Sequence, residues 1–411
     1  MSFPASMTTS TLPPRPARPL PPRLSPRQRL RRVALIALAV CALPIGVSWL
    51  SAMTASANTA LTINTIEWLR SNGGAGIASF IERIYYSLNA PATGGPGLKR
   101  LALKLHQQSI RHPPNITPIL HPALPGEGVW QPTESWTLQS SPVQITQFRS
   151  DPLYPQMVAG VAWIDPRRTS IQLYAGNLEP DVPMANRGPE MVPVNQRAKL
   201  LATFNSGFKL EDAHGGWADN GQTYAPLVKG QATFVGYTNG TYNIVDWTGG
   251  PKIGPNIDFA RQNLPLIVSN GAPNPQLANG ALWGATLGNS IRVWRSGLGI
   301  TARGDLIYAA ANNQTAQSLA AILIHAGAVR AMQLDINAYW PSFNYYTGPN
   351  AANPIKLLPD MVRPANRYLT PDDRDFFAVY LKANTRSGFP TGSTSTTASA
   401  TTTVGHTAGR G

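Results

Sequence analysis

The chain has 411 residues, of which 43% are hydrophobic and only 13% charged, and its net charge is +14. This hydrophobic share supports a substantial folded core, and the low charged share favours a β-rich, loop-rich extracytoplasmic domain over a helical cytosolic enzyme. The only cysteine, Cys41, lies in an apolar run, which excludes disulfides within the remaining chain and any cysteine-based metal or redox site.

The positive charge is concentrated at the N-terminus. Seven arginines precede the first acidic residue, Glu67, and account for half of the net charge. No dense Lys/Arg run with interleaved aromatic residues occurs elsewhere, so we predict no nucleic-acid binding. The basic segment instead indicates the orientation of a membrane helix.

Residues 1–32 are rich in Pro, Arg and Ser and are predicted to be a disordered cytoplasmic tail. The run 33–53 carries no charge and is long enough to cross a bilayer, so we predict a single transmembrane signal-anchor helix. The preceding arginines place the bulk of the chain outside the cytoplasm. The alternative is a cleaved signal peptide, because Ala55-Ser56-Ala57 has the form of a cleavage site.

Residues 54–142 are predicted to contain a helical stretch followed by a linker. Within 58–88 an apolar stripe at helical spacing, which we expect to pack on the protein's own domain, is formed by Ile77, Phe80, Ile81, Ile84 and Leu88. Pro and Gly are dense from 89 to 142, which is typical of a linker.

From Val143 the pattern changes to short strands, and we predict a mixed α+β domain over 143–384. The Asn239-Gly240 pair between two alternating runs predicts a hairpin, and Thr315 to Gly327 predicts a helix. A last helix is predicted to begin at Thr370-Pro371-Asp372-Asp373, and 385–411 is predicted to be a disordered tail. Further strands are expected at 158–165, 169–175, 231–237, 241–247, 290–294, 306–310 and 329–334.

Three segments place polar groups and small residues at the ends of predicted strands. The first, 204–209, is Phe-Asn-Ser-Gly-Phe-Lys, and its bend presents an amide and a hydroxyl. The second, 294–300, places Arg295 beside glycines whose backbone a ligand can approach closely. The third, 332–337, places Asp335 and Asn337 after a buried strand.

In this order the segments resemble the phosphodiester glycosidase family, over about 200–340. That family includes the enzyme that removes N-acetylglucosamine from mannose 6-phosphate. The residues of these segments look most like those of an actinobacterial, membrane-anchored branch of the family. Two departures stand out. Ser206 replaces a glycine of the family's Asn-Gly-Gly-Phe-Phe motif, and Ile336 and Asn337 replace glycines of its Leu-Asp-Gly-Gly-Gly-Ser motif.

The resemblance implies hydrolysis of a sugar-1-phosphodiester in envelope or exported glycans. A phosphate leaving group departs without strong acid help, so holding the anion matters most; Arg295 is expected to bind it, with Lys209 as a second cation. Asp335 is the expected nucleophile or base, with a second carboxylate from Glu211, Asp212 or Asp219. The predicted substrate-binding residues are Asn205, Ser206, Lys209, Asp219 and Asn337.

The alternative function is a non-catalytic module that binds an envelope glycan or phosphosugar. The departures at Ile336 and Asn337 favour it, whereas the order of Arg295 and Asp335 favours the enzyme. No metal site or cofactor is predicted, and the sequence does not determine the sugar or the oligomeric state.

Overall fold

A computed structural model describes residues 25–103, 112–134, 141–284 and 292–382. The chain divides into two units, Met1–Thr54 and Ala55–Gly411, which are considered separately. Residues 1–24 of the tail predicted at 1–32 lie outside the described residues, as do the tail predicted at 385–411 and the start of the strand expected at 290–294.

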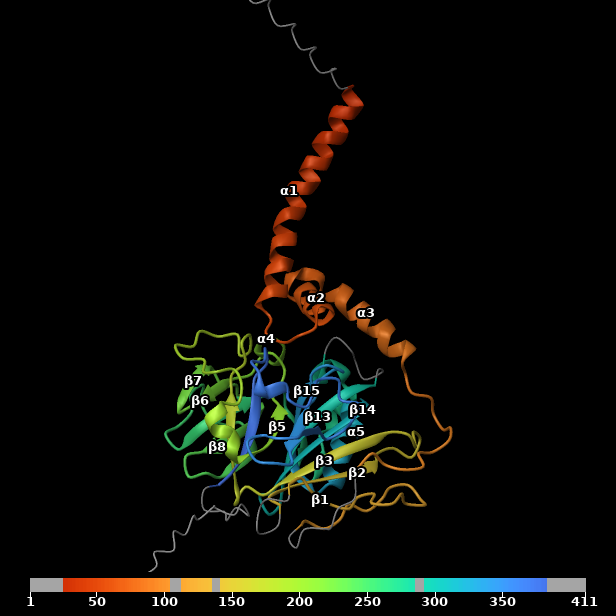
Figure 1. The fold of residues 1–411 in the computed structure, drawn as a ribbon, viewed down its shortest axis with the longest axis vertical. Coiled ribbons are helices and arrows are strands. Elements are labelled where there is room, and N and C mark those ends of the chain that lie inside the picture. The colour runs from red at the N-terminus through yellow and green to blue at the C-terminus, as the bar shows by residue number, and fades with distance from the viewer. Residues whose placement is uncertain (1–24, 104–111, 135–140, 285–291, 383–411) are drawn as a thin grey trace, which may run out of the picture. The chain divides into compact units, whose positions relative to one another are not determined.

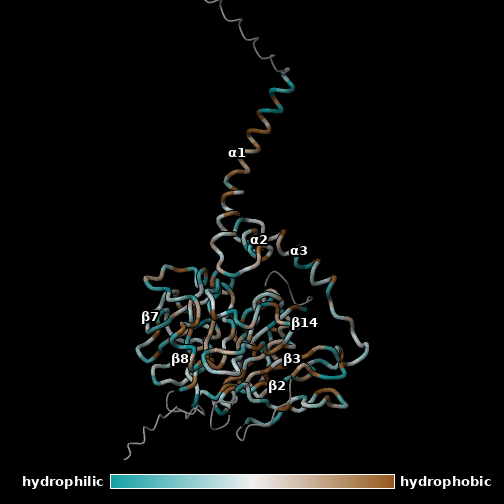
Figure 2. Tube along the Cα trace, viewed as in Figure 1, coloured by the Kyte–Doolittle hydropathy of each residue, from teal (hydrophilic) through white to brown (hydrophobic). Residues whose placement is uncertain are grey.

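The first unit consists, in its described part, of helix α1 (Pro26–Ala55). The helix is long and apolar enough to cross a membrane, a test that a signal sequence also passes. Figure 2 shows brown, apolar residues along most of α1. The helix begins at Pro26, so residues 26–32, which we predicted to be disordered, are its first two turns.

The second unit begins with the helical stretch predicted at 58–88. Helices α2 (Leu61–Leu69) and α3 (Ala75–Leu88) are joined by the kinked segment η1 (Arg70–Gly74), where Asn72 and Gly73 leave the helical conformation and Gly73 has a φ of 82°. The expectation that the apolar stripe packs on the domain is wrong. All five of its side chains are exposed: Ile77, Phe80, Ile81, Ile84 and Leu88.

Part of the segment predicted as a linker is integrated into the folded unit. Trp130 is fully buried, and strand β1 (Gln131–Pro132) pairs with β2 (Val143–Arg149). The carboxylate of Glu127 lies 2.8 Å from Arg149 Nη2, and both side chains are almost completely buried. The folded unit therefore begins well before the predicted boundary at residue 143. The chain before this boundary lies along the edge of the sheet, where it supplies a pairing strand and buried side chains.

We expect Glu127→Ala to lower the free energy of unfolding by about 3 kcal/mol, because it leaves Arg149 buried without its carboxylate. Urea unfolding followed by tryptophan fluorescence measures the effect. The exposed Asp181→Ala change is the control, with an expected loss below about 0.5 kcal/mol. An equal effect of the two substitutions would mean that residues 112–134 do not stabilise the domain.

The largest sheet has eight strands in the order β1-β2-β3-β14-β13-β15-β11-β12, all antiparallel. It forms one side of the folded unit in Figure 1. Its further strands are β3 (Val158–Ile164), β11 (Leu266–Ser269), β12 (Ala272–Pro273), β13 (Val293–Thr301), β14 (Leu306–Gln314) and β15 (Ala328–Ile336).

Two five-stranded antiparallel sheets complete the fold, in the orders β7-β6-β10-β8-β9 and β17-β16-β5-β18-β4. The first comprises β6 (Trp217–Asp219), β7 (Gln222–Ala225), β8 (Ala232–Tyr237), β9 (Tyr242–Asp246) and β10 (Ile257–Gln262). The second comprises β4 (Thr169–Tyr174), β5 (Leu200–Asn205), β16 (Phe343–Tyr346), β17 (Pro354–Lys356) and β18 (Phe376–Leu381).

Short helical segments connect the strands of these sheets. Among the helical segments that follow β1, only α5 (Ala316–His325) is longer than six residues. The capping box between Thr315 and Ser318 confirms the predicted helix start, and Leu319 and Leu323 are buried in the apolar cluster that involves the large sheet. The other segments are η2 (Val194–Lys199), α4 (Leu210–Ala213), η3 (Pro275–Ala278), η4 (Gly280–Trp283) and η5 (Arg367–Leu369).

An aromatic core joins the large sheet to the second small one. Phe204 of β5 stacks on Phe343 and Phe377, and Tyr308 of β14 packs against it with ring centroids 5.5 Å apart. The predicted α+β class is therefore confirmed, and the core lies between antiparallel sheets. The β8–β9 hairpin is also as predicted, whereas β3 and β4, adjacent in the chain, belong to different sheets.

The helix predicted from Thr370 is wrong: the chain forms an extended loop followed by strand β18. The physical reason is that 376–381 is a continuous apolar run that is buried on both faces between β5 and β4. The acidic residues Asp372, Asp373 and Asp375 do not cap a helix; each binds a partner within the folded unit.

Candidate functional site

The first motif forms a loop between two strand ends. Residues 206–209 follow β5, and the Ser206 carbonyl accepts a hydrogen bond of 3.0 Å from the Asp335 amide at the end of β15. The Gly207 carbonyl accepts a hydrogen bond from Arg374 Nη2 at 3.3 Å. A Cβ at Gly207 would lie 2.9 Å from Asn263 Cβ, so only glycine permits this approach.

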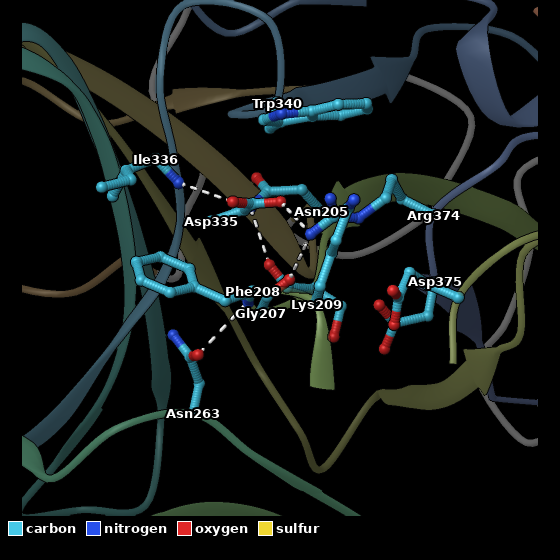
Figure 3. Close-up of polar contacts among 12 residues, drawn as sticks. Asn205, Gly207, Phe208, Lys209, Asn263, Asp335, Ile336, Trp340, Arg374 and Asp375 are labelled. Carbon is cyan, nitrogen blue, oxygen red and sulfur yellow. Dashed lines mark hydrogen bonds and ion pairs between the residues drawn. The ribbon is translucent and has the colours of Figure 1, made fainter. Parts of the chain in front are cut away.

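Asp335 is buried at the centre of this arrangement (Figure 3). Its Oδ2 lies 2.7 Å from Arg374 Nη2, and its Oδ1 accepts a hydrogen bond of 2.9 Å from the Ile336 amide. Burial raises the pKa of Asp335 to about 7, and the positive charge of Arg374 only partly opposes this. The Trp340 ring covers the Arg374 guanidinium at 4.7 Å, which shields this ion pair from solvent. The carboxyl can therefore gain or lose a proton near neutral pH.

A pocket of about 130 Å³ opens beside Asp335. Its apolar walls include Phe208, Leu264 and Ile336, and charged side chains make up much of the remaining lining. Three cations and three carboxylates line it: Arg70, Lys209, Arg374, Glu67, Asp212 and Asp335. Such a mixed lining suits a small ligand that has both an apolar face and polar or charged groups.

Glu67 of α2 is a second carboxylate in the same pocket. It lies 2.6 Å from Lys209 Nζ and 3.0 Å from Arg70 Nη1. Burial alone would raise the pKa of Glu67, but these two cations outweigh it and lower the pKa below its ordinary value. Two carboxyl groups of the pocket thus differ, because Glu67 stays ionised whereas Asp335 titrates near pH 7.

Asn337 connects the end of β15 to α3. It adopts a left-handed conformation with a φ of 80°, and its Nδ2 donates to Glu82 Oε1 at 3.1 Å. The Tyr86 hydroxyl donates to Asn337 Oδ1. The left-handed backbone explains how asparagine is accommodated where the resembled motif has glycine, because asparagine tolerates this conformation better than most residues do.

Two predicted binding residues lie beneath the pocket rather than on its lining. Asn205 is 3% exposed; its Nδ2 donates to Ser296 Oγ at 3.0 Å, and its Oδ1 accepts from Tyr308 and from the Ser342 amide. Its amide is therefore committed to joining the strands. Ser206 is also buried, and its hydroxyl has no hydrogen-bond partner in the described parts of the chain.

Arg295 likewise does not line the pocket. It is 1% exposed, and its guanidinium donates to the Gln314 and Trp283 carbonyls and to Gln333 Oε1 at 2.9–3.0 Å. Burial without a carboxylate lowers the pKa of Arg295 to about 10. Its donors are directed at protein oxygens, so it holds β13, β14 and β15 together.

We expect Arg295→Met to lower the free energy of unfolding by about 3 kcal/mol, because several buried oxygens lose their donor. Thermal unfolding measures this loss. The folded variant is expected to keep the binding properties of the pocket. The control is Arg330→Met, which removes a half-buried arginine whose side chain donates a hydrogen bond to β9. Loss of ligand binding by a fully folded Arg295→Met protein would show that Arg295 contributes to ligand binding and is not only structural.

Asp219 lies on the lining of a different pocket, of about 300 Å³, with Asp258 and Tyr224. Burial and the nearby Asp258 carboxylate raise the pKa of Asp219 to about 7. The other two candidates for the second carboxylate lie in different surroundings. Asp212 lines the pocket of Asp335, whereas Glu211 is exposed beside Lys209. Across the described ranges, no group of three or more His, Cys, Asp or Glu side chains is placed to hold a metal ion.

Among the charged and aromatic residues of the pocket, the sequence analysis missed four: Glu67, Arg70, Trp340 and Arg374. The signal for Arg374 was the cluster Asp-Asp-Arg-Asp before an apolar run, which is unusual in a chain with so few charges. Glu67 and Arg70 follow the apolar run of α1 closely and gave no local signal. Only their tertiary contacts reveal them: Glu67 pairs with Lys209, Arg70 pairs with Glu82, and both line the pocket.

Comparisons with known proteins give distant similarities only. No protein-family model matches, and no curated protein matches. The catalytic domain of zebrafish N-acetylglucosamine-1-phosphodiester alpha-N-acetylglucosaminidase, which is auto-inhibited by its pro-peptide, has a TM-score of 0.39 and 14% identity, covering 62% of this chain and 88% of its own. These values describe a remote similarity and do not assign a family.

Two further solved structures are similar to this chain at 14% identity. A hypothetical protein from Synechocystis has a TM-score of 0.35 and covers 60% of this chain and 63% of its own. A putative exported protein from Burkholderia pseudomallei has a TM-score of 0.34, with 56% and 75% covered. Neither similarity defines an activity for this chain.

Proposed function

We propose that this protein is a membrane-anchored extracytoplasmic hydrolase that cleaves a sugar-1-phosphodiester at the pocket of Asp335. The observation that carries the proposal is the pairing, in one pocket, of a carboxyl with a pKa of about 7 and a carboxylate that stays ionised. Glycosidases usually use two carboxyl groups with different pKa values to transfer a glycosyl group to water.

The cations of the pocket suit an anionic leaving group. Arg374 has a buried Nε that lacks a hydrogen-bond partner within the described residues, and Lys209 lies on the same lining. A phosphate oxygen that departs with the bonding electron pair gains negative charge, which these cations stabilise. We therefore assign the anion-binding role to Arg374 and Lys209, and a structural role to Arg295.

In the proposed reaction Asp335 acts as ionised carboxylate, either attacking the anomeric carbon or removing a proton from the attacking water. The bond between the anomeric carbon and the phosphate oxygen breaks, and its electrons leave with the phosphate. In the nucleophilic route, water then hydrolyses the glycosyl ester, which releases the sugar and regenerates the Asp335 carboxylate. Asn337 also lines the pocket; Glu82 accepts one of the two N–H groups of its side-chain amide, and the other would bind a sugar hydroxyl or a phosphate oxygen. Glu67 balances the charge of Lys209 and Arg70 when no substrate is bound.

The membrane location rests on α1. Its length and apolar composition suit a single span, and the arginines that precede the span favour a cytoplasmic N-terminus. The folded unit that follows would then lie outside the cytoplasm, where glycans linked through phosphodiesters are accessible.

The test is hydrolysis by the full-length protein in detergent, in water enriched with ¹⁸O. The substrates are nucleotide sugars and sugar-1-phosphates esterified to an alcohol or a lipid. Cleavage at the anomeric carbon places ¹⁸O in the sugar, whereas attack at phosphorus places it in the phosphate. Label in the sugar supports the proposal. Label in the phosphate would replace it by a phosphodiesterase, and binding without hydrolysis would replace it by a binding module.

A further inference from the structure

Helix α3 presents an apolar face that the described part of the protein leaves uncovered. We call this the α3 outer face, and its side chains are between 45% and 81% exposed. Five residues at helical spacing form it: Ile77, Phe80, Ile81, Ile84 and Leu88. A contiguous apolar stripe of this kind on a folded protein marks a surface that another apolar phase covers.

The opposite side of the helix fixes this orientation. Ala78 and Tyr86 are buried, Tyr86 packs in an apolar cluster with Phe208 and Ile336, and its hydroxyl binds Asn337 beside the pocket. Glu82 pairs with Arg70, which also binds Glu67 of α2. The inner side of α3 is thus held by polar contacts, so the helix cannot bury its outer face by rolling onto the domain without breaking them.

The position of α3 in the chain indicates what covers the outer face. Only α2 and η1 separate α1 from α3 along the chain, so the length of the intervening chain limits how far α3 can lie from the end of the apolar span. The exposed Arg83 lies at the border of the outer face, where a cation can reach lipid phosphates. An amphipathic helix with these features lies in the plane of a bilayer interface.

We propose that the α3 outer face docks on the lipid bilayer in which α1 is anchored. This inference rests on the proposed membrane anchor and not on the catalytic activity. Docking would hold the inner side of α3, and with it Asn337 and the pocket, next to the lipid headgroups.

The native sequence provides the design of the test, because Cys41 in α1 is its only cysteine. Full-length protein is reconstituted into phosphatidylcholine/phosphatidylglycerol vesicles and labelled at one cysteine with an environment-sensitive fluorophore. The label is placed at Cys41, or, in a Cys41→Ser background, at Ile81→Cys or Leu88→Cys. Leu153→Cys is the matched control, because Leu153 is 68% exposed and belongs to the turn between β2 and β3.

Quenching by lipids with a nitroxide on the acyl chain reports contact with the bilayer. We expect quenching at positions 81 and 88 to be several-fold stronger than at position 153, and iodide in the water to quench in the reverse order. Equal lipid quenching at 81, 88 and 153, with Cys41 strongly quenched, would overturn docking and leave the anchor intact. An unquenched Cys41 label would overturn the anchor. A blue-shifted label at 81 that lipid does not quench would indicate a protein partner, and would also overturn lipid docking.

Discussion

Asp335→Asn is expected to reduce turnover of a sugar-1-phosphodiester by about 10³-fold or more, because the amide can neither attack the anomeric carbon nor accept a proton. Asparagine has nearly the same shape and can still accept a hydrogen bond from Arg374, so the pocket keeps its geometry. Substrate affinity is therefore expected to change far less than kcat. Steady-state kinetics with the full-length protein, together with equilibrium binding, measure both quantities.

The matched control for this substitution is Asp219→Asn. Asp219 has the same elevated pKa of about 7, but it lines a different pocket. Its replacement is expected to leave kcat within about twofold of the original value. Equal losses from the two substitutions would assign the effect to general destabilisation, and full activity of Asp335→Asn would remove this residue from the mechanism.

Arg374→Met is expected to lower kcat/KM by about 10²- to 10³-fold, because the pocket loses a cation that stabilises the departing phosphate. It also changes the pH dependence. Asp335 must be ionised to act, so activity of the native protein should rise with pH through about 7. Arg374 is the charge that lowers the pKa of Asp335, so removing it raises this pKa further. The midpoint of the pH–rate profile should then move to higher pH.

Arg374→Lys separates the two effects. Lysine keeps the positive charge, so the pH midpoint should stay near that of the native protein, but its single ammonium cannot reproduce the planar donor set of arginine. We expect an intermediate kcat/KM. A pH midpoint that is identical in the methionine, lysine and native proteins would show that Arg374 does not control the ionisation that limits the rate.

The local signals in the sequence determined the elements with clear periodicity or turn chemistry. The apolar run of α1, the capped helix after Thr315 and the hairpin at Asn239-Gly240 are each set by neighbouring residues. The sequence also singled out Asp335, from its place after a predicted buried strand and from the resemblance of the surrounding segments to the phosphodiester glycosidase family. These features depend on interactions between residues close in the chain.

The tertiary structure decided which of the other polar residues reach the pocket. Arg295 and Arg374 have the same side chain, but the pairing of β13 with β14 and β15 surrounds Arg295 with carbonyl oxygens, whereas the loop before β18 places Arg374 against Asp335. The propensity of 370–382 for helix gave way to burial of 376–381 between two strands. Long-range strand pairing fixed both outcomes, and no pattern within a short window encodes it.

The helical segment after α1 illustrates the same division. Its periodicity predicted a helix correctly, but the expectation that its apolar stripe packs on the domain was wrong. Periodicity defines a face and does not say what the face contacts. The contacts of Tyr86 with Asn337 and of Glu67 with Lys209 turn the polar side inward, because a buried charge or hydroxyl needs a specific partner while an exposed apolar side chain does not.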